Sequence, residues 1–273
     1  MAKHKHWGGR LYLIFAFALL YTPILYLIYY SFSSGTNMST FKGFTLSHYQ
    51  TLFSDSRLIV ILLDTLLIAL LSSLVATIVG TMGALGIHTL KQRKLQNFIL
   101  SLNNILMVSP DVIIGASFLI LFTTLGIALG FGSVLASHIA FSIPIVVLLV
   151  LPRLKEMNGS MVDAARDLGA NRWQILSKVI LPYILPSIFS GFFMALTYSL
   201  DDFAVTFFVT GNGFATLSVE IYSRARQGIN LEINALSAIM FIFSILLIVG
   251  YYFINQYTQS RRNKRQRGGA YLQ

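Results

Sequence analysis

Residues 163–182 read DAARDLGANRWQILSKVILP, a polar and charged segment that separates two long apolar stretches of the chain. Hydrophobic residues make up 55% of the 273 residues and charged residues only 11%, whereas about a quarter of a soluble domain is charged. The chain therefore has room for several membrane helices, and residues 163–182 form a loop between two of them. Because Cys is absent, the chain has no disulfide and no thiolate chemistry.

Six segments are long and apolar enough to cross a membrane, which takes about 20 residues. They predict an all-α membrane protein whose single transmembrane domain covers residues 1–273. The predicted spans are 11–31, 58–87, 97–125, 131–152, 185–208 and 235–257.

The basic residues predict how these spans are oriented. Of the 20 Lys and Arg residues, 16 lie in residues 1–10, 88–96, 153–182 and 258–273. Cytoplasmic loops of membrane proteins carry such an excess. Both termini, the 153–182 loop and the basic tail 258–273 are therefore expected in the cytoplasm, and residues 209–234 in an outer loop. The net charge of +10 then indicates contact with membrane lipid and not with nucleic acid.

The loop has local signals of a helix, a turn and a second helix. Ser160 is a candidate N-cap with Asp163 in the first turn, and Gly169 fits the C′ position, where positive φ is usual. A second helix is expected from Asn171, and Pro182 marks the start of the next span. Local physics leaves two interpretations open: an ordinary pair of interfacial helices, or a compact knob that fits a groove on another protein.

The predicted spans contain four carboxylates and no Lys or Arg. An ionisable group in a span is costly and indicates a functional site. At 1.5 Å per residue, three of the spans place an acid roughly 6–10 Å below the outer face. A cavity lined by these acids would suit a cationic solute and repel anions. The predicted substrate-path residues are Asp64, Asp111, Tyr198, Asp201 and Asp202.

Each acid also has a structural alternative. Asp64 can be a residue of a helix start. Ser109-Pro110-Asp111 can form a kink, with Ser109 as N-cap and Asp111 in the first turn. Asp201 and Asp202 point about 100° apart if they share one helix, so only one of them would face a pathway.

The loop resembles the cytoplasmic coupling loop of ABC-importer permeases, whose motif is E-A-A, three residues, G, nine residues and I-x-L-P. Asp163 stands where Glu is usual and Val179 where Ile is usual; both keep the chemical type. The resemblance implies the type I importer permease fold, with six transmembrane helices and both termini in the cytoplasm. It implies that a separate ATPase binds this loop, and that ATP binding there rocks the permease halves between inward-facing and outward-facing states. The implied ATPase-coupling residues are Asp163, Ala164, Ala165, Arg166, Gly169, Leu181 and Pro182.

The C-terminal third further resembles the PotC-type permeases of spermidine/putrescine importers. The similar stretches are LDDF at 200–203, FFVTG at 207–211, IYS at 221–223 and EINAL at 232–236. Polyamines are flexible polycations, which agrees with the acids in the predicted spans.

This resemblance implies a multi-pass protein of the bacterial cell membrane that works in a complex. The implied partners are a second homologous permease, two copies of an ATP-binding subunit that holds ATP and Mg, and an extracellular or periplasmic substrate-binding protein. We expect the outer segments 32–57 and 209–234 to contact that binding protein; plain connecting loops are the alternative.

The chain contains no Walker A, Gly-x-Ser-x-Gly or His-Glu-x-x-His sequence. The prediction is therefore a transport subunit with no catalytic residues, no metal site and no cofactor of its own. Alternatives are an ABC permease for another cationic or complexed substrate, such as thiamine or ferric iron, and a proton-coupled secondary transporter. A membrane hydrolase that uses Asp201 and Asp202 is disfavoured, because adjacent side chains on a helix diverge.

Overall fold

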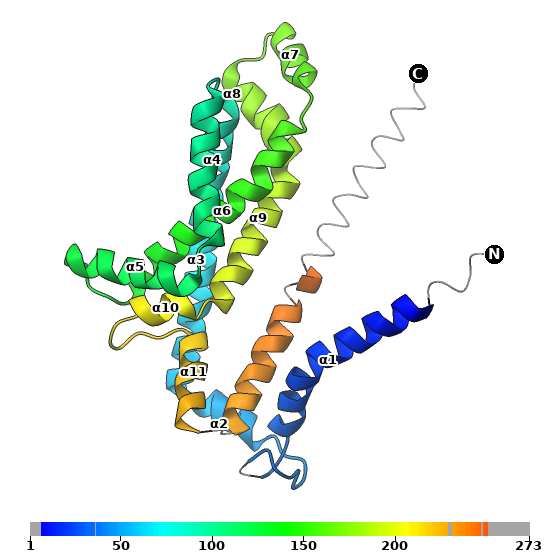
Figure 1. Ribbon diagram of the computed structural model, residues 1–273, viewed down its shortest axis with the longest axis vertical. Coiled ribbons are helices and arrows are strands. Elements are labelled where there is room, and N and C mark those ends of the chain that lie inside the picture. The colour runs from blue at the N-terminus through cyan, green and yellow to red at the C-terminus, as the bar shows by residue number, and fades with distance from the viewer. Residues whose placement is uncertain (1–6, 36, 229–230, 247, 251–273) are drawn as a thin grey trace. The chain divides into compact units, whose positions relative to one another are not determined.

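The computed structural model describes residues 7–35, 37–228, 231–246 and 248–250 (Figure 1). These residues confirm the all-α fold class: helices dominate, and Ser33 and Phe44 form an isolated β-bridge. Among the described residues, five helices are long and apolar enough to cross a membrane, or six if one strongly bent pair counts as a single span.

The chain divides into two compact units. The central unit comprises residues 61–219 with 249–273, and the terminal unit comprises residues 1–60 with 220–248. The central unit contains most of α3 (Ser56–Thr89) and the helices that follow it, which are α4 (Arg93–Val108), α5 (Asp111–Thr124), α6 (Phe131–Lys155), α7 (Gly159–Asp167), α8 (Arg172–Ile175), the π-helical segment η1 (Leu176–Ile180), α9 (Leu181–Asp201) and α10 (Ala204–Val209).

The core of the central unit forms where α3, α6 and α9 meet. Val146 of α6 is fully buried and lies between two glycines. A Cβ atom added to Gly80 of α3 would lie 2.7 Å from Val146 Cβ, and one added to Gly191 of α9 would lie 3.2 Å from Val146 Cγ1. Small residues allow membrane helices to approach closely, so these two glycines let α3 and α9 pack on both sides of α6.

The predicted span 97–125 is divided between two helices. α4 ends at Val108, α5 begins at Asp111, and the two axes are bent by 105°. Pro110 has no N–H and disfavours a helical conformation of the preceding residue, and Ser109 is extended with ψ 138°. The kink that the sequence allows as an alternative is therefore present, but Ser109 is the C-cap of α4 and Pro110, not Ser109, is the N-cap of α5.

The structure also differs from the expected continuous helix over 185–208. α9 ends at Asp201, and Asp202 is extended with ψ 122° before α10 begins at Ala204. The Asp202 carboxylate accepts hydrogen bonds from the backbone N–H groups of Val205 and Thr206 at 3.3 and 2.8 Å. Such local side-chain bonds compete with helix continuation, and here they start a new helix.

Close backbone packing holds α10 against α5. A Cβ atom added to Gly115 of α5 would lie 2.8 Å from the Phe208 ring and 3.0 Å from Val205 Cα of α10. A side chain at position 115 would separate the two helices. The short helix α10 therefore packs at one defined position against α5.

The terminal unit contains α1 (Trp7–Ser31), α2 (Ser47–Ser54), most of α11 (Leu217–Gln227) and most of the helix Leu231–Gly250. Hydrogen bonds hold the start of α2 against the end of α1: the Tyr49 and Ser31 hydroxyls are 2.7 Å apart, and His48 Nε2 lies 2.9 Å from the Ser33 carbonyl oxygen. The end of the last predicted span, 251–257, and the basic tail 258–273 lie outside the described residues.

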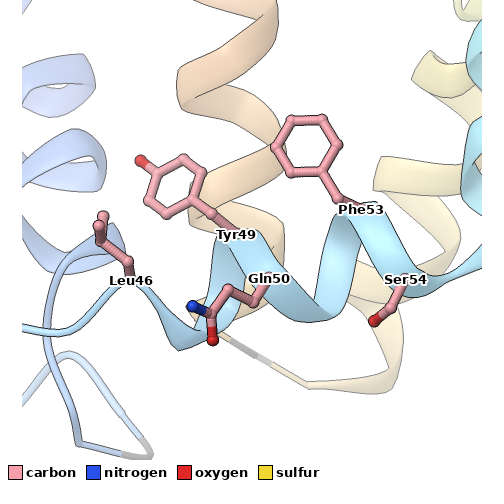
Figure 2. A pocket seen from close by; sticks show the side chains of 5 residues that line it. All are labelled: Leu46, Tyr49, Gln50, Phe53 and Ser54. Atoms are coloured by element: carbon pink, nitrogen blue, oxygen red, sulfur yellow. The ribbon is translucent and has the colours of Figure 1, made fainter.

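One surface of α2 borders an open, mostly apolar hollow of about 490 Å³. Figure 2 shows the Tyr49 and Phe53 rings on the same side of the helix. Phe53 and the preceding Leu46 are exposed, so α2 presents apolar surface. The residues that line the hollow are Leu46, Tyr49, Gln50, Phe53 and Ser54.

Candidate functional site

The loop between α6 and α9 carries the exposed helix α7. Asn158 caps this helix, and its side-chain oxygen accepts a hydrogen bond from the Ser160 N–H at 3.0 Å. The prediction of Ser160 as N-cap is wrong by two positions, because Asn158 already occupies the extended conformation that an N-cap requires. Asp163 consequently lies beyond the first turn of α7, and it forms an exposed ion pair of 3.2 Å with Arg166.

Gly169 ends this helix as expected. Its φ is +79°, a conformation that L-residues other than glycine adopt at a cost. Its N–H donates to the Arg166 carbonyl at 2.8 Å, and the Ala170 N–H donates to the Ala165 carbonyl at 3.0 Å. These two bonds form a Schellman turn, which satisfies carbonyls at the helix end.

A second helix starts at the predicted place. The Asn171 side chain accepts from the Gln174 N–H at 2.8 Å, and the Gln174 side chain accepts from the Asn171 N–H at 2.9 Å. This reciprocal pair is a capping box. The turn exposes Leu168 and Trp173 at 88% and 71% of their surface, so the loop ends in a projecting apolar pair.

This second helix differs from the prediction in how it meets the next span. It continues from Arg172 to Asp201, through the π-helical segment and past Pro182. The Leu181 N–H donates to the Leu176 carbonyl, five residues back, and Pro182 has no N–H to donate. The wider π turn keeps the chain helical up to Pro182, so the second helix and the predicted span form one helix.

The predicted coupling residues are divided between surface and core. Ala164 and Pro182 are exposed, and Ala165 is half-buried. Leu181 is partly buried against the apolar core of α3, α6 and α9. The loop therefore connects the exposed helix α7 to residues of α9 that pack in the core.

Two of the predicted substrate-path residues are in direct contact. The Tyr198 hydroxyl of α9 donates a hydrogen bond to Asp111 Oδ1 of α5 at 2.8 Å. Both residues are exposed, and the Tyr198 ring stacks edge-on against Phe141 of α6 with centroids 5.1 Å apart. Asp201 lies three residues after Tyr198 and so shares its face of the helix.

The two adjacent acids have different environments. Asp201 is exposed at the last position of α9, and among the described residues no hydrogen bond or ion pair of its carboxylate is seen. Asp202 is buried, and it accepts a hydrogen bond from the Thr206 hydroxyl at 2.7 Å besides its two backbone bonds. Asp202 Oδ2 also lies 3.5 Å from His138 Nε2.

Asp64 is half-buried on α3. Within the described part of the chain, none of the observed interactions joins its carboxylate to the other three acids. The structure therefore brings Asp111, Tyr198 and Asp201 to one region, turns Asp202 inward, and leaves Asp64 separate in its contacts.

A buried polar cluster around His138 links these helices. His138 Nδ1 lies 2.6 Å from Ser199 Oγ, and His138 Nε2 lies 2.9 Å from Thr206 Oγ1. The Ser199 hydroxyl is in turn 3.1 Å from that of Ser72 on α3. The sequence indicates only that His138 is a packed polar residue; its partners are distant in the chain and no local pattern identifies them.

A charged cluster in the terminal unit was not foreseen. Arg224 of α11 lies 2.7 Å from Glu220, 3.3 Å from Asp55 and 3.7 Å from Glu232, and Arg57 lies 3.3 Å from Glu220. The Glu220 side chain is only 7% exposed. The spacing of Glu220 and Arg224, four residues apart, is the one local signal of this cluster.

The cluster affects the protonation of Asp55. Partial burial raises its pKa, but hydrogen bonds from the Leu58 N–H and from Arg224 outweigh this effect and hold the pKa of Asp55 below its ordinary value. The carboxylate is therefore charged at neutral pH and joins the α2–α3 turn to α11.

Comparisons with known proteins show the family of this chain. The model of the family described as "Binding-protein-dependent transport system inner membrane component" matches residues 76–264. The chain is 37% identical to the spermidine/putrescine transport system permease protein PotC of Escherichia coli K12, over 89% of this chain and 90% of that protein. It is 34% identical to the putrescine transport system permease protein PotI of the same organism, over 93% and 91%.

A solved structure supports the fold. A chain of a bacterial ABC transporter involved in the import of the acidic polysaccharide alginate superposes with a TM-score of 0.72, over 93% of this chain and 94% of that chain, at 19% sequence identity. The fold is that of the type I ABC importer permeases. From the family match and the two permease relatives it follows that the chain belongs to the family of binding-protein-dependent transport system inner membrane components.

Proposed function

We propose that this chain is a permease subunit of an ATP-driven importer of polyamines, such as spermidine and putrescine. One observation carries the proposal: the match to the spermidine/putrescine permease extends over about nine-tenths of both chains. The chain forms half of a translocation pathway, and a second, homologous permease forms the other half.

The acids at the α5, α9 and α10 junction support a cationic cargo. Asp111 and Asp201 are exposed in the structure and lie on or beside the same helix face as Tyr198. A charged side chain is expensive in contact with lipid, so these acids face water or the partner permease. An anionic lining attracts ammonium groups, and the Tyr198 ring adds a surface on which a cation can lie.

The exposed loop supports coupling to a separate ATPase. In the central unit, α7 lies at the opposite end from α5 and α10 (Figure 1). We place α7 in the cytoplasm with both chain termini, where two copies of an ATP-binding subunit hydrolyse ATP and press on the loop. Leu168 and Trp173 are the apolar contacts, and the Schellman turn at Gly169 sets the direction in which they project.

The opposite side of the membrane is the place for the substrate-binding protein. We propose that it contacts the outer segments 32–57 and 209–234. The exposed Leu46 and Phe53 around α2 supply apolar contacts in the first segment, and α11 supplies basic ones in the second, because Arg226 is exposed.

Uptake by the complete complex tests the proposed cargo. Membrane vesicles that contain both permeases, the ATPase and the binding protein are loaded with ATP and given radiolabelled spermidine, putrescine, thiamine or ferric iron. We expect ATP-dependent uptake of a polyamine. Uptake of thiamine or iron alone would replace the polyamine assignment, and uptake without the ATPase would indicate a secondary transporter.

Asp201 offers a sharper test with matched variants. Asp201→Asn removes the charge and keeps the shape, so the half-saturating polyamine concentration should rise roughly 10- to 100-fold, as for loss of a charged hydrogen bond worth about 1.5–3 kcal/mol. Asp201→Glu keeps the charge and should retain most of the uptake. Wild-type uptake in Asp201→Asn would remove this residue from the pathway.

A further inference from the structure

The buried cluster around His138 contacts the chain on both sides of the α9–α10 break. Ser199 lies before the break and bonds Nδ1 at 2.6 Å; Thr206 lies after it and bonds Nε2 at 2.9 Å. His138, Ser72 and Thr206 are fully buried, and Ser199 is nearly so. One imidazole ring from α6 therefore connects the end of α9 with the start of α10.

The hydrogen bonds have a defined direction at the Asp202 end. An ionised carboxylate accepts hydrogen bonds but does not donate them. The Thr206 hydroxyl, 2.7 Å from Asp202 Oδ2, must then donate to the carboxylate. Its oxygen is left to accept from His138, so Nε2 carries a hydrogen in either charge state of the ring. The cluster is thus a chain of bonds that leads from His138 through Thr206 to Asp202.

This chain of bonds determines which acid is turned inward. Asp202 receives the Val205 N–H, the Thr206 N–H and the Thr206 hydroxyl, and the two backbone bonds require a non-helical backbone at Asp202. With Asp202 held inside, the preceding residue Asp201 remains on the exposed face of α9. If α9 continued as a regular helix, the Val205 and Thr206 N–H groups would bond to the backbone carbonyls four residues before them, and the Asp202 carboxylate would lose both backbone bonds.

We propose that His138 is a positioning residue for transport: it holds the α9–α10 break so that Asp201 faces the pathway and Asp202 is a structural anion. The effect on transport rests on the proposed function above. The effect on the exposure of position 201 does not, and it can be measured without any substrate.

Thiol labelling tests the structural part. The chain has no Cys, so Asp201→Cys introduces the only thiol of this subunit. In the purified complex, a small cationic methanethiosulfonate should label Asp201→Cys at a rate similar to Asn212→Cys, an exposed control position after α10. Adding His138→Leu should slow labelling at position 201 about tenfold, the order expected when one charged hydrogen-bond network is lost, and leave position 212 unchanged.

Two conservative variants report which contact matters. His138→Gln can keep the bond to Thr206, and His138→Asn can keep only the bond to Ser199. Because the proposed chain of bonds passes through Thr206, Gln should preserve labelling at position 201 better than Asn. If the His138→Leu complex does not assemble, comparing the labelling of position 201 in His138→Gln and His138→Asn still tests the proposal. Equal labelling in all variants, or no labelling of Asp201→Cys with His138 present, would overturn the proposal.

Transport kinetics test whether His138 acts through Asp201. His138→Leu should raise the half-saturating polyamine concentration about tenfold, with the ATPase still bound and the maximal rate little changed. In an Asp201→Asn background the same substitution should add less than about twofold, because residues that act through one contact are not additive. Additive effects would refute the positioning role. If the wild-type complex transports no polyamine, the proposed function fails while the labelling result stands.

Discussion

The turn at Gly169 allows a quantitative test of how the permease is coupled to its ATPase. Gly169 has φ +79°, and a Cβ atom added there would meet nothing within 4 Å. Replacing Gly169 by Val therefore introduces no clash and acts only through backbone conformation. A left-handed conformation costs an L-residue roughly 1–2 kcal/mol.

The conformational cost at position 169 should lower the affinity of the loop for the ATPase. If the ATPase binds only loops in which the turn is formed, Gly169→Val should weaken association about 5- to 30-fold, at 1.4 kcal/mol for each factor of ten. Asn tolerates this conformation better than other residues, so Gly169→Asn should lose clearly less. Gly159→Val is the matched control: it lies at the start of the same helix, also in open space, without positive φ.

The assay is the dissociation constant of the ATPase for the permease pair in lipid nanodiscs, measured together with ATP-dependent uptake. The expected order of affinity is wild type and Gly159→Val first, then Gly169→Asn, then Gly169→Val. Equal affinity of Gly169→Val and wild type would show that the ATPase does not depend on this turn, and the account of the loop would be wrong.

Two further predictions concern packing and charge. Gly80→Ala places a methyl group 2.7 Å from Val146 Cβ. The overpacking should cost about 1–3 kcal/mol of stability, which exceeds the roughly 1 kcal/mol that Ala gains over Gly in a helix. Gly86→Ala places its methyl group in open space and should show only the gain in stability. Equal unfolding midpoints of the complexes that carry Gly80→Ala and Gly86→Ala would contradict the close packing around Val146. The lowered pKa of Asp55 means that the bonds its carboxylate accepts from the Leu58 N–H and from Arg224 stabilise the fold fully above the ordinary value of 3.8, and that this effect is lost as the pH falls through the lowered pKa. Hydrogen exchange of α11 should thus be faster in Asp55→Asn than in wild type at neutral pH, and this difference should shrink as the pH falls below 3.8; a difference that does not shrink in acid would exclude the Asp55 carboxylate as the cause.

Local sequence patterns predicted the loop well where the signal lies within a few residues. Gly169 is identifiable because a glycine that follows a short helix commonly takes positive φ. The start of the second helix is likewise local, since Asn171 and Gln174 cap each other. The N-cap was misplaced because Asn158 and Ser160 are both suitable residues, and only the path of the chain after α6 decides between them.

The helix interruptions were predicted less well. Pro110 indicated a kink, and the structure has a bend of 105° there. No proline or glycine next to Asp202 predicts the break there. It depends on bonds to Thr206, whose hydroxyl also contacts His138, and hydropathy alone does not distinguish this arrangement from a continuous helix.

The sequence by itself determined that the chain is an all-α membrane protein with an exposed polar loop, since hydropathy, basic residues and helix caps act over short stretches. Only the tertiary structure decided which of the two adjacent acids is exposed. That choice depends on Ser199 and His138, which are 61 positions apart and meet only when α6 packs against α9. A buried polar group must find a hydrogen-bond partner, and the packing of the helices determines which partner is within reach.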